Sequence, residues 1–338
     1  MKMLKRFVCL ALSVTMIFSL AACGGTFDGN YKEVTGEEYN TVVADVKTAY
    51  EKGGIEGLLD GNTTSGNKDI RLAAAPEAAA SGAKAEAKVA LEYKGADGKK
   101  VKYNVATSEE VCVNDGKLEM AAKSETKIQS TIKETTNSTL KAEVYSKDGN
   151  LYLGVKAENK GFKATDPMDS KLKVTTESTG AIDMSVKYMV NFGMLTEYAE
   201  SIVLKSADAL NKAGVRVYTD NKGDTLKIKY ALDKDAYAKL GFGDSKAEVE
   251  LKEYYVIVVL DNNKGLVGVK VKCDIKSTRN GDVTTGKVEG SVEKTDKGVK
   301  FPSFDKYEEA NTENVLSTTG GIIKFFETVA RSTGELFD

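Results

Sequence analysis

The segment KAEAKVALEYK, residues 84–94, alternates small or apolar side chains with charged ones. One parity holds Ala85, Ala87, Val89, Leu91 and Tyr93, and the other includes Glu86, Lys88, Glu92 and Lys94. Successive side chains of a β-strand point to opposite faces, so this period of two predicts a strand with one apolar and one wet face. The segment GADGKK then turns the chain, and Val101, Tyr103 and Val105 continue the apolar face.

The same pattern recurs along the chain. The alternating runs are joined by turn segments rich in Asn, Asp and Gly, namely NDGK, KDGN, DNKGD, DNNKG, RNGD and TDKG. Such turns supply the positive φ that tight hairpins need. The late strands show one face with Val267, Val269, Val271, Cys273 and Ile275 and the opposite face with Lys270, Lys272 and Asp274. The pattern predicts an antiparallel meander with one wet face and one apolar face.

Helical patterns flank and interrupt this meander. In VTGEEYNTVVADVKTAY, residues 34–50, Thr35 and Glu38 form a capping box, and one helical face then holds Tyr39, Val42, Val43, Val46 and Tyr50. Between positions 180 and 214, MLTEYAESIVLKSADALNKAG predicts a helix that ends at Gly214, and a shorter helix is expected near Asp233. The tail carries a helical stripe of Ile322, Phe325, Phe326 and Val329.

These elements predict one α+β domain over residues 35–310, followed by a C-terminal amphipathic helical tail over residues 311–338. We expect a large curved antiparallel sheet, a meander resembling a half-barrel, with the N-terminal helix and the helical insertion packed against it. A mature chain of about 280 residues or more can bury a sizeable core, and nothing between the strands has the composition of a domain linker.

The N-terminus has the layout of an export signal. Lys2, Lys5 and Arg6 precede an apolar run over residues 7–20, which is too short to span a bilayer. The sequence LAAC that follows resembles the lipobox of bacterial lipoproteins. The resemblance implies that residues 1–22 are removed as a signal peptide and that Cys23 is acylated, for example with palmitate. An ordinary secretory signal with a chance cysteine is the alternative.

Two acyl chains suffice for stable anchoring. We therefore expect a protein attached to the cell membrane through Cys23, on its extracytoplasmic face. Residues 23–34 would serve as a short tether between the acylated cysteine and the domain.

Composition excludes several functions. The formal charge is −2, and it becomes −5 once residues 1–22 leave, because 45 Lys and Arg then face 50 Asp and Glu. This balance gives no support for nucleic-acid binding. Histidine is absent from the sequence, which excludes Ser-His-Asp and Cys-His catalysis and the usual zinc hydrolase sites. We therefore expect no catalytic residue, metal or cofactor, and a protein that is not an enzyme.

One near match to a phosphate-binding loop occurs in GDVTTGKV, residues 281–288. Gly281, Gly286 and Lys287 fit that motif, but Val288 stands where a Mg²⁺-binding hydroxyl is required. The preceding Asn280 also makes this stretch the start of a hairpin strand, whereas a phosphate loop leads into a helix. The hairpin is the better interpretation.

Two cysteines remain in the domain, Cys112 and Cys273. Export permits a disulfide between them. The residues leave the alternative open that both are separate thiols, with Cys273 facing the core.

Methionine is clustered. Of the five methionines after Cys23, four lie between Met168 and Met194. Flexible thioethers suit changeable apolar contacts, so we take Met184, Met189, Phe192 and Met194 as candidates for lining a ligand site. The alternative is that they fill core beneath a helix.

The architecture is similar to that of the LolA/LppX-type and LprG-like lipoproteins. The segment EVYSKDGNLYLGVK, residues 143–156, resembles the strand–turn–strand pieces of that group. The resemblance implies a half-open barrel that holds acyl chains or a lipidated client in an apolar cavity. The leading hypothesis is therefore a lipid-anchored protein that binds a lipid or lipoprotein intermediate between sheet and helices. A non-enzymatic surface interaction module with a solid core is the alternative.

The lipobox interpretation has a direct test. Replacing Cys23 by Ala removes the thiol that carries the acyl chains, so we expect uncleaved precursor and no incorporation of labelled palmitate. A variant that still takes up the label would show that Cys23 is not the acylation site.

Overall fold

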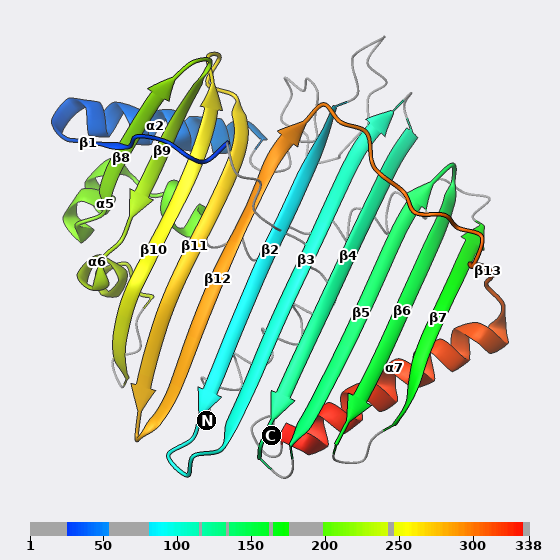
Figure 1. Ribbon diagram of the computed structural model, residues 1–338. Coiled ribbons are helices and arrows are strands. Elements are labelled where there is room, and N and C mark those ends of the chain that lie inside the picture. The colour runs from blue at the N-terminus through cyan, green and yellow to red at the C-terminus, as the bar shows by residue number, and fades with distance from the viewer. Residues whose placement is uncertain are drawn as a thin grey trace.

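The computed structural model describes residues 26–53, 81–114, 117–132, 135–161, 165–175, 199–242 and 247–333. Within these ranges the strands form one sheet of thirteen strands, in the order β1-β8-β9-β10-β11-β12-β2-β3-β4-β5-β6-β7-β13 (Figure 1). Every neighbouring pair is antiparallel except β7 and β13. The predicted α+β fold with a large antiparallel sheet is confirmed.

The sheet is built from two meanders. The first comprises β2 (Ser81–Lys94), β3 (Lys100–Asn114), β4 (Lys117–Ser130), β5 (Thr136–Lys147), β6 (Asn150–Lys160) and β7 (Thr165–Thr175). The second comprises β8 (Arg216–Lys222), β9 (Thr225–Ala231), β10 (Glu248–Asp261), β11 (Leu266–Arg279) and β12 (Asp282–Thr295). The last strand of the second meander, β12, pairs with the first strand of the first, β2.

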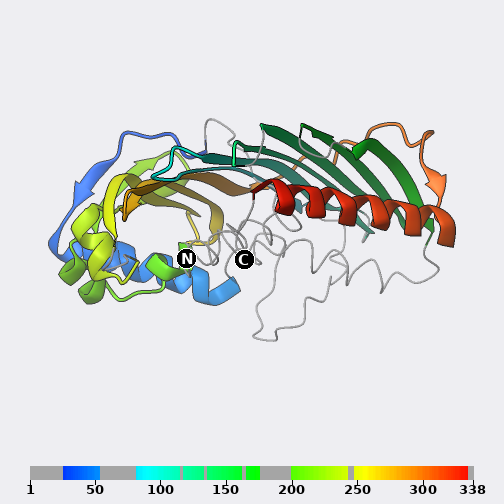
Figure 2. The same cartoon turned by 90° about the horizontal axis from the view of Figure 1, so that it is seen from below.

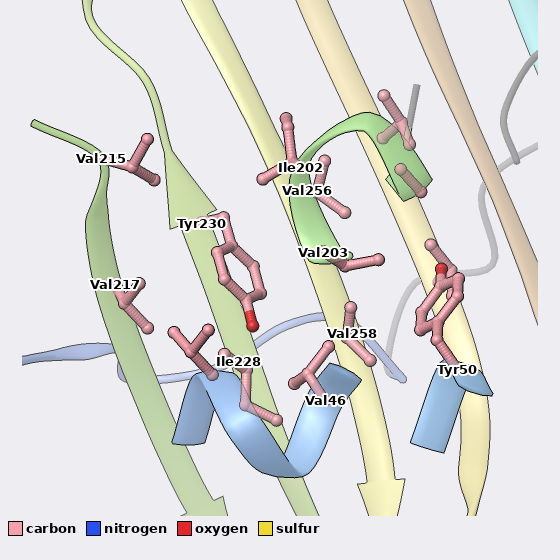
Figure 3. Packing of buried hydrophobic residues seen from close by; sticks show 14 of the residues in the cluster. Val46, Tyr50, Ile202, Val203, Val215, Val217, Ile228, Tyr230, Val256 and Val258 are labelled. Atoms are coloured by element: carbon pink, nitrogen blue, oxygen red, sulfur yellow. The ribbon is translucent and has the colours of Figure 1, made fainter. Parts of the chain in front are cut away.

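All the labelled helices lie on the concave face of the curved sheet (Figure 2). Helices α2 (Gly36–Gly53), α5 (Ala207–Ala213) and α6 (Lys234–Lys239) cover the second meander. The five apolar residues predicted to share one face of the first helix are all buried in the main core. Figure 3 shows Val46 and Tyr50 of α2 and Ile202 and Val203 packed over strand residues that include Val256.

The helical insertion is broken rather than continuous. Residues 199–203 are helical, the helix stops at Leu204, and α5 begins after Ser206, whose Oγ accepts a hydrogen bond from the Ala209 amide at 3.2 Å. A serine that satisfies a free amide starts a new helix. The predicted end at Gly214 is confirmed by its left-handed φ of 90°, and Asp233 caps α6 as expected.

The C-terminal helix is part of the domain rather than an appended tail. Helix α7 (Thr312–Thr333) crosses the concave face of the first meander. Phe325 and Val329 are buried there with Val89, Val105 and Leu140. The Thr318 and Ser170 hydroxyls are 2.6 Å apart. The predicted helical stripe is thus correct, and the sheet itself is its partner.

The segment before α7, residues 296–311, runs over the convex face, and we call it the strap. Its Phe304 ring stacks on Tyr152 at 3.8 Å, and Tyr307 packs edge-on against Tyr145 at 6.5 Å. The strap ends as β13 (Glu308–Glu309) beside β7. At the opposite edge β1 (Lys32–Val34) pairs with β8. Short end strands of this kind protect the edges of a sheet against pairing with other chains.

One predicted facing is wrong. Val267 was expected on the same face as Val269, but it packs on the convex face with Phe27 and Ile257. The register between β10 and β11 shifts here, since Val259 is opposite Gly268 whereas Leu260 is opposite Leu266. The extra residue of this β-bulge reverses the facing of one side chain.

Helix α7 offers a matched pair for testing whether it belongs to the fold. Phe325→Ala removes a ring that is 1% exposed, so the free energy of unfolding should fall by about 3–5 kcal/mol. Ile323→Ala, at a site that is 53% exposed, should change it by less than about 0.5 kcal/mol. Urea denaturation measures both. Equal, small effects would mean that α7 is not anchored by Phe325.

Candidate functional site

The concave side of β2–β7 is almost free of charge. The register carries the alternation of residues 84–94 across all six strands, with Val89 opposite Val105 and Val105 opposite Thr126, and it shifts only between β6 and β7, after Ala157. Among the described residues on this side of β2–β6 and of β7 from Met168 onward, Glu109 is the one charged side chain. The remainder are apolar, hydroxyl or amide residues, so this side of the sheet favours contact with apolar side chains or ligands.

Side-chain size varies along this face. Small residues occupy the part beside the main core and are buried, namely Ala83, Ala85, Ala87 and Gly290. Towards β7 the side chains are larger, and several are only half-buried, namely Val144, Leu151, Leu153, Val155 and Val174. Half-buried apolar side chains that adjoin across strands form a patch that favours contact with another apolar group.

Helix α7 lies beside this patch and carries apolar side chains in addition to the stripe that packs on the sheet. A side chain at Gly321 would collide with the thioether of Met168, and Thr318 contacts Ser170, one step further along β7. Around the helix in the same sense follow Ile322, Val315 and Phe326. Of these, Phe326 packs in the cluster that contains Phe325, Val155 and Met168. Val144 and Leu153 of the patch lie side by side on β5 and β6.

Beyond these residues the helix exposes apolar side chains to solvent. Val315 is 42% exposed, Ile323 53% and Leu316 66%. A helix that packs on one sheet needs a single apolar stripe, whereas α7 has one that extends halfway round its circumference. We call the patch on β5–β7 together with this side of α7 the apolar concave face.

The convex face has the opposite character. Lysines and carboxylates on neighbouring strands form ion pairs, such as Lys102–Glu92 at 3.4 Å, Lys141–Glu125 at 3.0 Å and Lys156–Asp169 at 3.2 Å. Exposed pairs of this kind contribute about 0–1 kcal/mol each. Their main effect is to keep this side of the sheet in water.

Sequence reasoning did not single out Glu109 or the half-buried patch. The signal was available, because Glu109 has the inward parity in an otherwise apolar series. Leu151, Leu153 and Val155 likewise share one parity within EVYSKDGNLYLGVK. Parity alone does not show which part of a face a helix covers. The position of the helix decides which residues remain accessible.

Several predicted site residues lie outside the described residues. These are Cys23 and the candidate ligand-lining residues Met184, Met189, Phe192 and Met194, so their roles stay predictions. Met168, the first of the methionine cluster, is half-buried on β7 and packs against the cluster that contains Phe325.

Of the two possibilities that the sequence left open, the disulfide between Cys112 and Cys273 is wrong, and both cysteines are free thiols. Cys273 is opposite Val288, which faces the concave side, whereas Cys112 follows Val111 and has the convex parity. The sheet itself therefore separates the two sulfur atoms. Strands β12 and β2 also lie between them.

The near match to a phosphate loop is a hairpin, as predicted. Asn280 and Gly281 have φ of 52° and 83° and join β11 to β12. Lys287 pairs with Asp274 at 3.1 Å. Searching the described part of the chain finds no group of three His, Cys, Asp or Glu placed to hold a metal ion. The same part contains no helix that is long and apolar enough to cross a membrane.

Comparison with known proteins identifies no family for this chain. No family model matches the chain, and no curated protein matches its sequence. A β-barrel-like protein of the domain of unknown function DUF1849 from Brucella abortus aligns with 62% of this chain and 97% of its own, at 9% identity and a TM-score of 0.20. The translocator domain of the autotransporter NalP from Neisseria meningitidis aligns with 75% of this chain and 96% of its own, at 7% identity and a TM-score of 0.18.

Scores this low carry no argument about this chain. The resemblance to LolA/LppX-type lipoproteins therefore stands on architecture alone, which is a large curved sheet with helices on one side.

The thiols give a test of the two-faced sheet. Burial raises the pKa of Cys273 to about 12 and also raises the pKa of Cys112. Because only the thiolate reacts, Cys273 in the folded protein should react with a disulfide reagent at pH 8 about a thousandfold more slowly than in guanidinium chloride. Its rate should rise about tenfold per pH unit up to its pKa.

Both domain thiols should titrate after unfolding without reductant. A loss of two thiols under these conditions would show a disulfide and contradict the placement on opposite faces.

Proposed function

We propose that this chain is a lipid-anchored protein of the extracytoplasmic membrane face whose apolar concave face binds a hydrophobic ligand with acyl chains. The observation that carries the proposal is the half-buried apolar patch on β5–β7, which lies beside a helix that exposes Val315, Leu316 and Ile323. The lipobox-like sequence before Cys23 supports the anchor.

The apolar concave face limits the class of ligand. Polar ligands need hydrogen-bond partners when they leave water, and an unpartnered polar group costs about 1–3 kcal/mol in mutational terms. The patch offers methyl and methylene groups from Val144, Leu151 and Leu153, which favour burial of any apolar chain without directional demands. A ligand whose acyl chains lie along the sheet and whose polar group stays in water fits this chemistry.

The proposed role is binding rather than catalysis. The absence of histidine supports this, since the common nucleophilic triads and zinc sites require it.

Native mass spectrometry of the purified protein, with phospholipid added in detergent, tests the proposal. We expect a bound lipid with an acyl mass in addition to the chains on Cys23. A protein without any bound lipid, and with stability independent of added lipid, would instead favour a surface interaction module with a solid core.

Two substitutions test whether the ligand binds at this patch. Val144→Gln with Leu153→Gln puts two unpartnered amides against the acyl chain, each costing about 1–3 kcal/mol. Lipid affinity measured by displacement of a fluorescent fatty acid should fall by about tenfold or more. Leu153→Met, which nearly conserves volume, should keep affinity within a few fold.

The matched control is Thr139→Gln with Glu158→Gln, on the same two strands but on the convex face. It should leave lipid affinity unchanged. If the concave pair reduces affinity no more than the convex pair does, the ligand does not bind at this patch.

A further inference from the structure

The chain docks on the sheet very soon after Cys23. Phe27 is 4% exposed and packs on the convex face against Ile257 and Val259. The Tyr31 hydroxyl donates to the Phe27 carbonyl oxygen at 2.6 Å. Most of the segment expected to be a free tether, residues 23–34, is therefore fixed to the domain.

The fixed point sets how far the domain can lie from its anchor. Phe27 follows Cys23 by four residue steps, which reach about 13 Å when fully extended at ~3.3 Å per residue. Phe27 lies beside Gly268 of β11 on the convex side. The link from an acylated Cys23 would therefore join the domain on its convex side.

The convex face also carries the charge that such a surface attracts. Among the strand residues whose side chains are described, and apart from Asp166 at the register shift of β7, the convex side of β2–β7 has thirteen lysines and eight carboxylates. The lysines are Lys84, Lys88, Lys94, Lys100, Lys102, Lys123, Lys127, Lys141, Lys147, Lys156, Lys160, Lys171 and Lys173. The carboxylates are Glu86, Glu92, Glu110, Glu119, Glu125, Glu143, Glu158 and Asp169.

This positive surplus is local. The whole sequence has a formal charge of −2, and the strap adds Lys297, Lys300 and Lys306 against four carboxylates, so it hardly changes the balance. Lysine side chains can extend their ammonium groups away from the sheet toward a planar anionic partner. Basic surfaces near a lipid anchor bind anionic headgroups through this kind of long-range attraction.

We propose that the convex face of β2–β7 lies against anionic phospholipid headgroups, with the concave face directed away from the membrane. The inference rests on the lipid anchor of the proposed function, but not on the hydrophobic ligand. It gives the convex lysines a role that their weak ion pairs do not.

Fluorescent labels test the orientation in the acylated protein reconstituted into vesicles. One label is attached at Gln129→Cys on the convex face of β4, and the other at Ser317→Cys on the exposed side of α7. A quencher lipid reports the distance of each from the surface. With 30% phosphatidylglycerol in phosphatidylcholine, the label at position 129 should be quenched at least twofold more than the label at 317. Salt at about 0.5 M should reduce the difference, because it screens exposed charges.

A charge-matched pair of variants completes the experiment. Replacing Lys102, Lys127, Lys141, Lys156 and Lys160 by Gln should abolish the difference between the labels. Replacing five lysines on the helical side, Lys52, Lys205, Lys212, Lys234 and Lys239, changes the net charge equally and should preserve it.

Equal quenching of both labels in an acylated protein, or quenching that ignores phosphatidylglycerol, would overturn the orientation alone. A protein whose mass shows no acyl chains on Cys23 would overturn both the anchor and the orientation.

Discussion

An unbroken register of side chains across neighbouring strands underlies the rest of this structure. From β12 through β7 each strand pairs with the next without a shift until Ala157, so residues of like parity stay on one side over seven strands. A slip by one residue in any strand would exchange its apolar and charged sets. Core, surface and proposed site all depend on this register being kept.

The same register gives the molecule two unlike surfaces from one layer of backbone. Apolar residues on the concave side pack against α2, α5, α6 and α7 and leave a half-buried patch on β5–β7. Charged residues on the convex side keep that surface in water and leave a surplus of lysine. Binding of an apolar ligand and attraction to an anionic membrane would thus use opposite faces, so neither needs to compete with the other.

Residues 26–34 and the strap cover part of the convex face and the two edges of the open sheet. Residues 26–34 run over the convex face and end as the edge strand β1, while the strap crosses the convex face and continues around the other edge into α7. Aromatic contacts hold each segment, with Phe27 and Tyr31 at one end and Phe304 and Tyr307 at the other. The C-terminal segment therefore links the packing of the convex face to the helix that borders the proposed ligand site.

The sequence alone determined the local structure, because local structure depends on neighbours in the chain. The alternation of residues 84–94, the buried face of α2, the hairpin at Asn280 and Gly281 and the helix end at Gly214 were all predicted correctly. Only the tertiary structure decided the order of strands, since every strand carries the same alternation and nothing local marks β12 as the partner of β2. It also decided the reversal of Val267 and the separation of Cys112 from Cys273, because each depends on which strand lies opposite. The accessible patch beside α7 belongs to this second group, as exposure is set by how far a covering helix extends over the sheet.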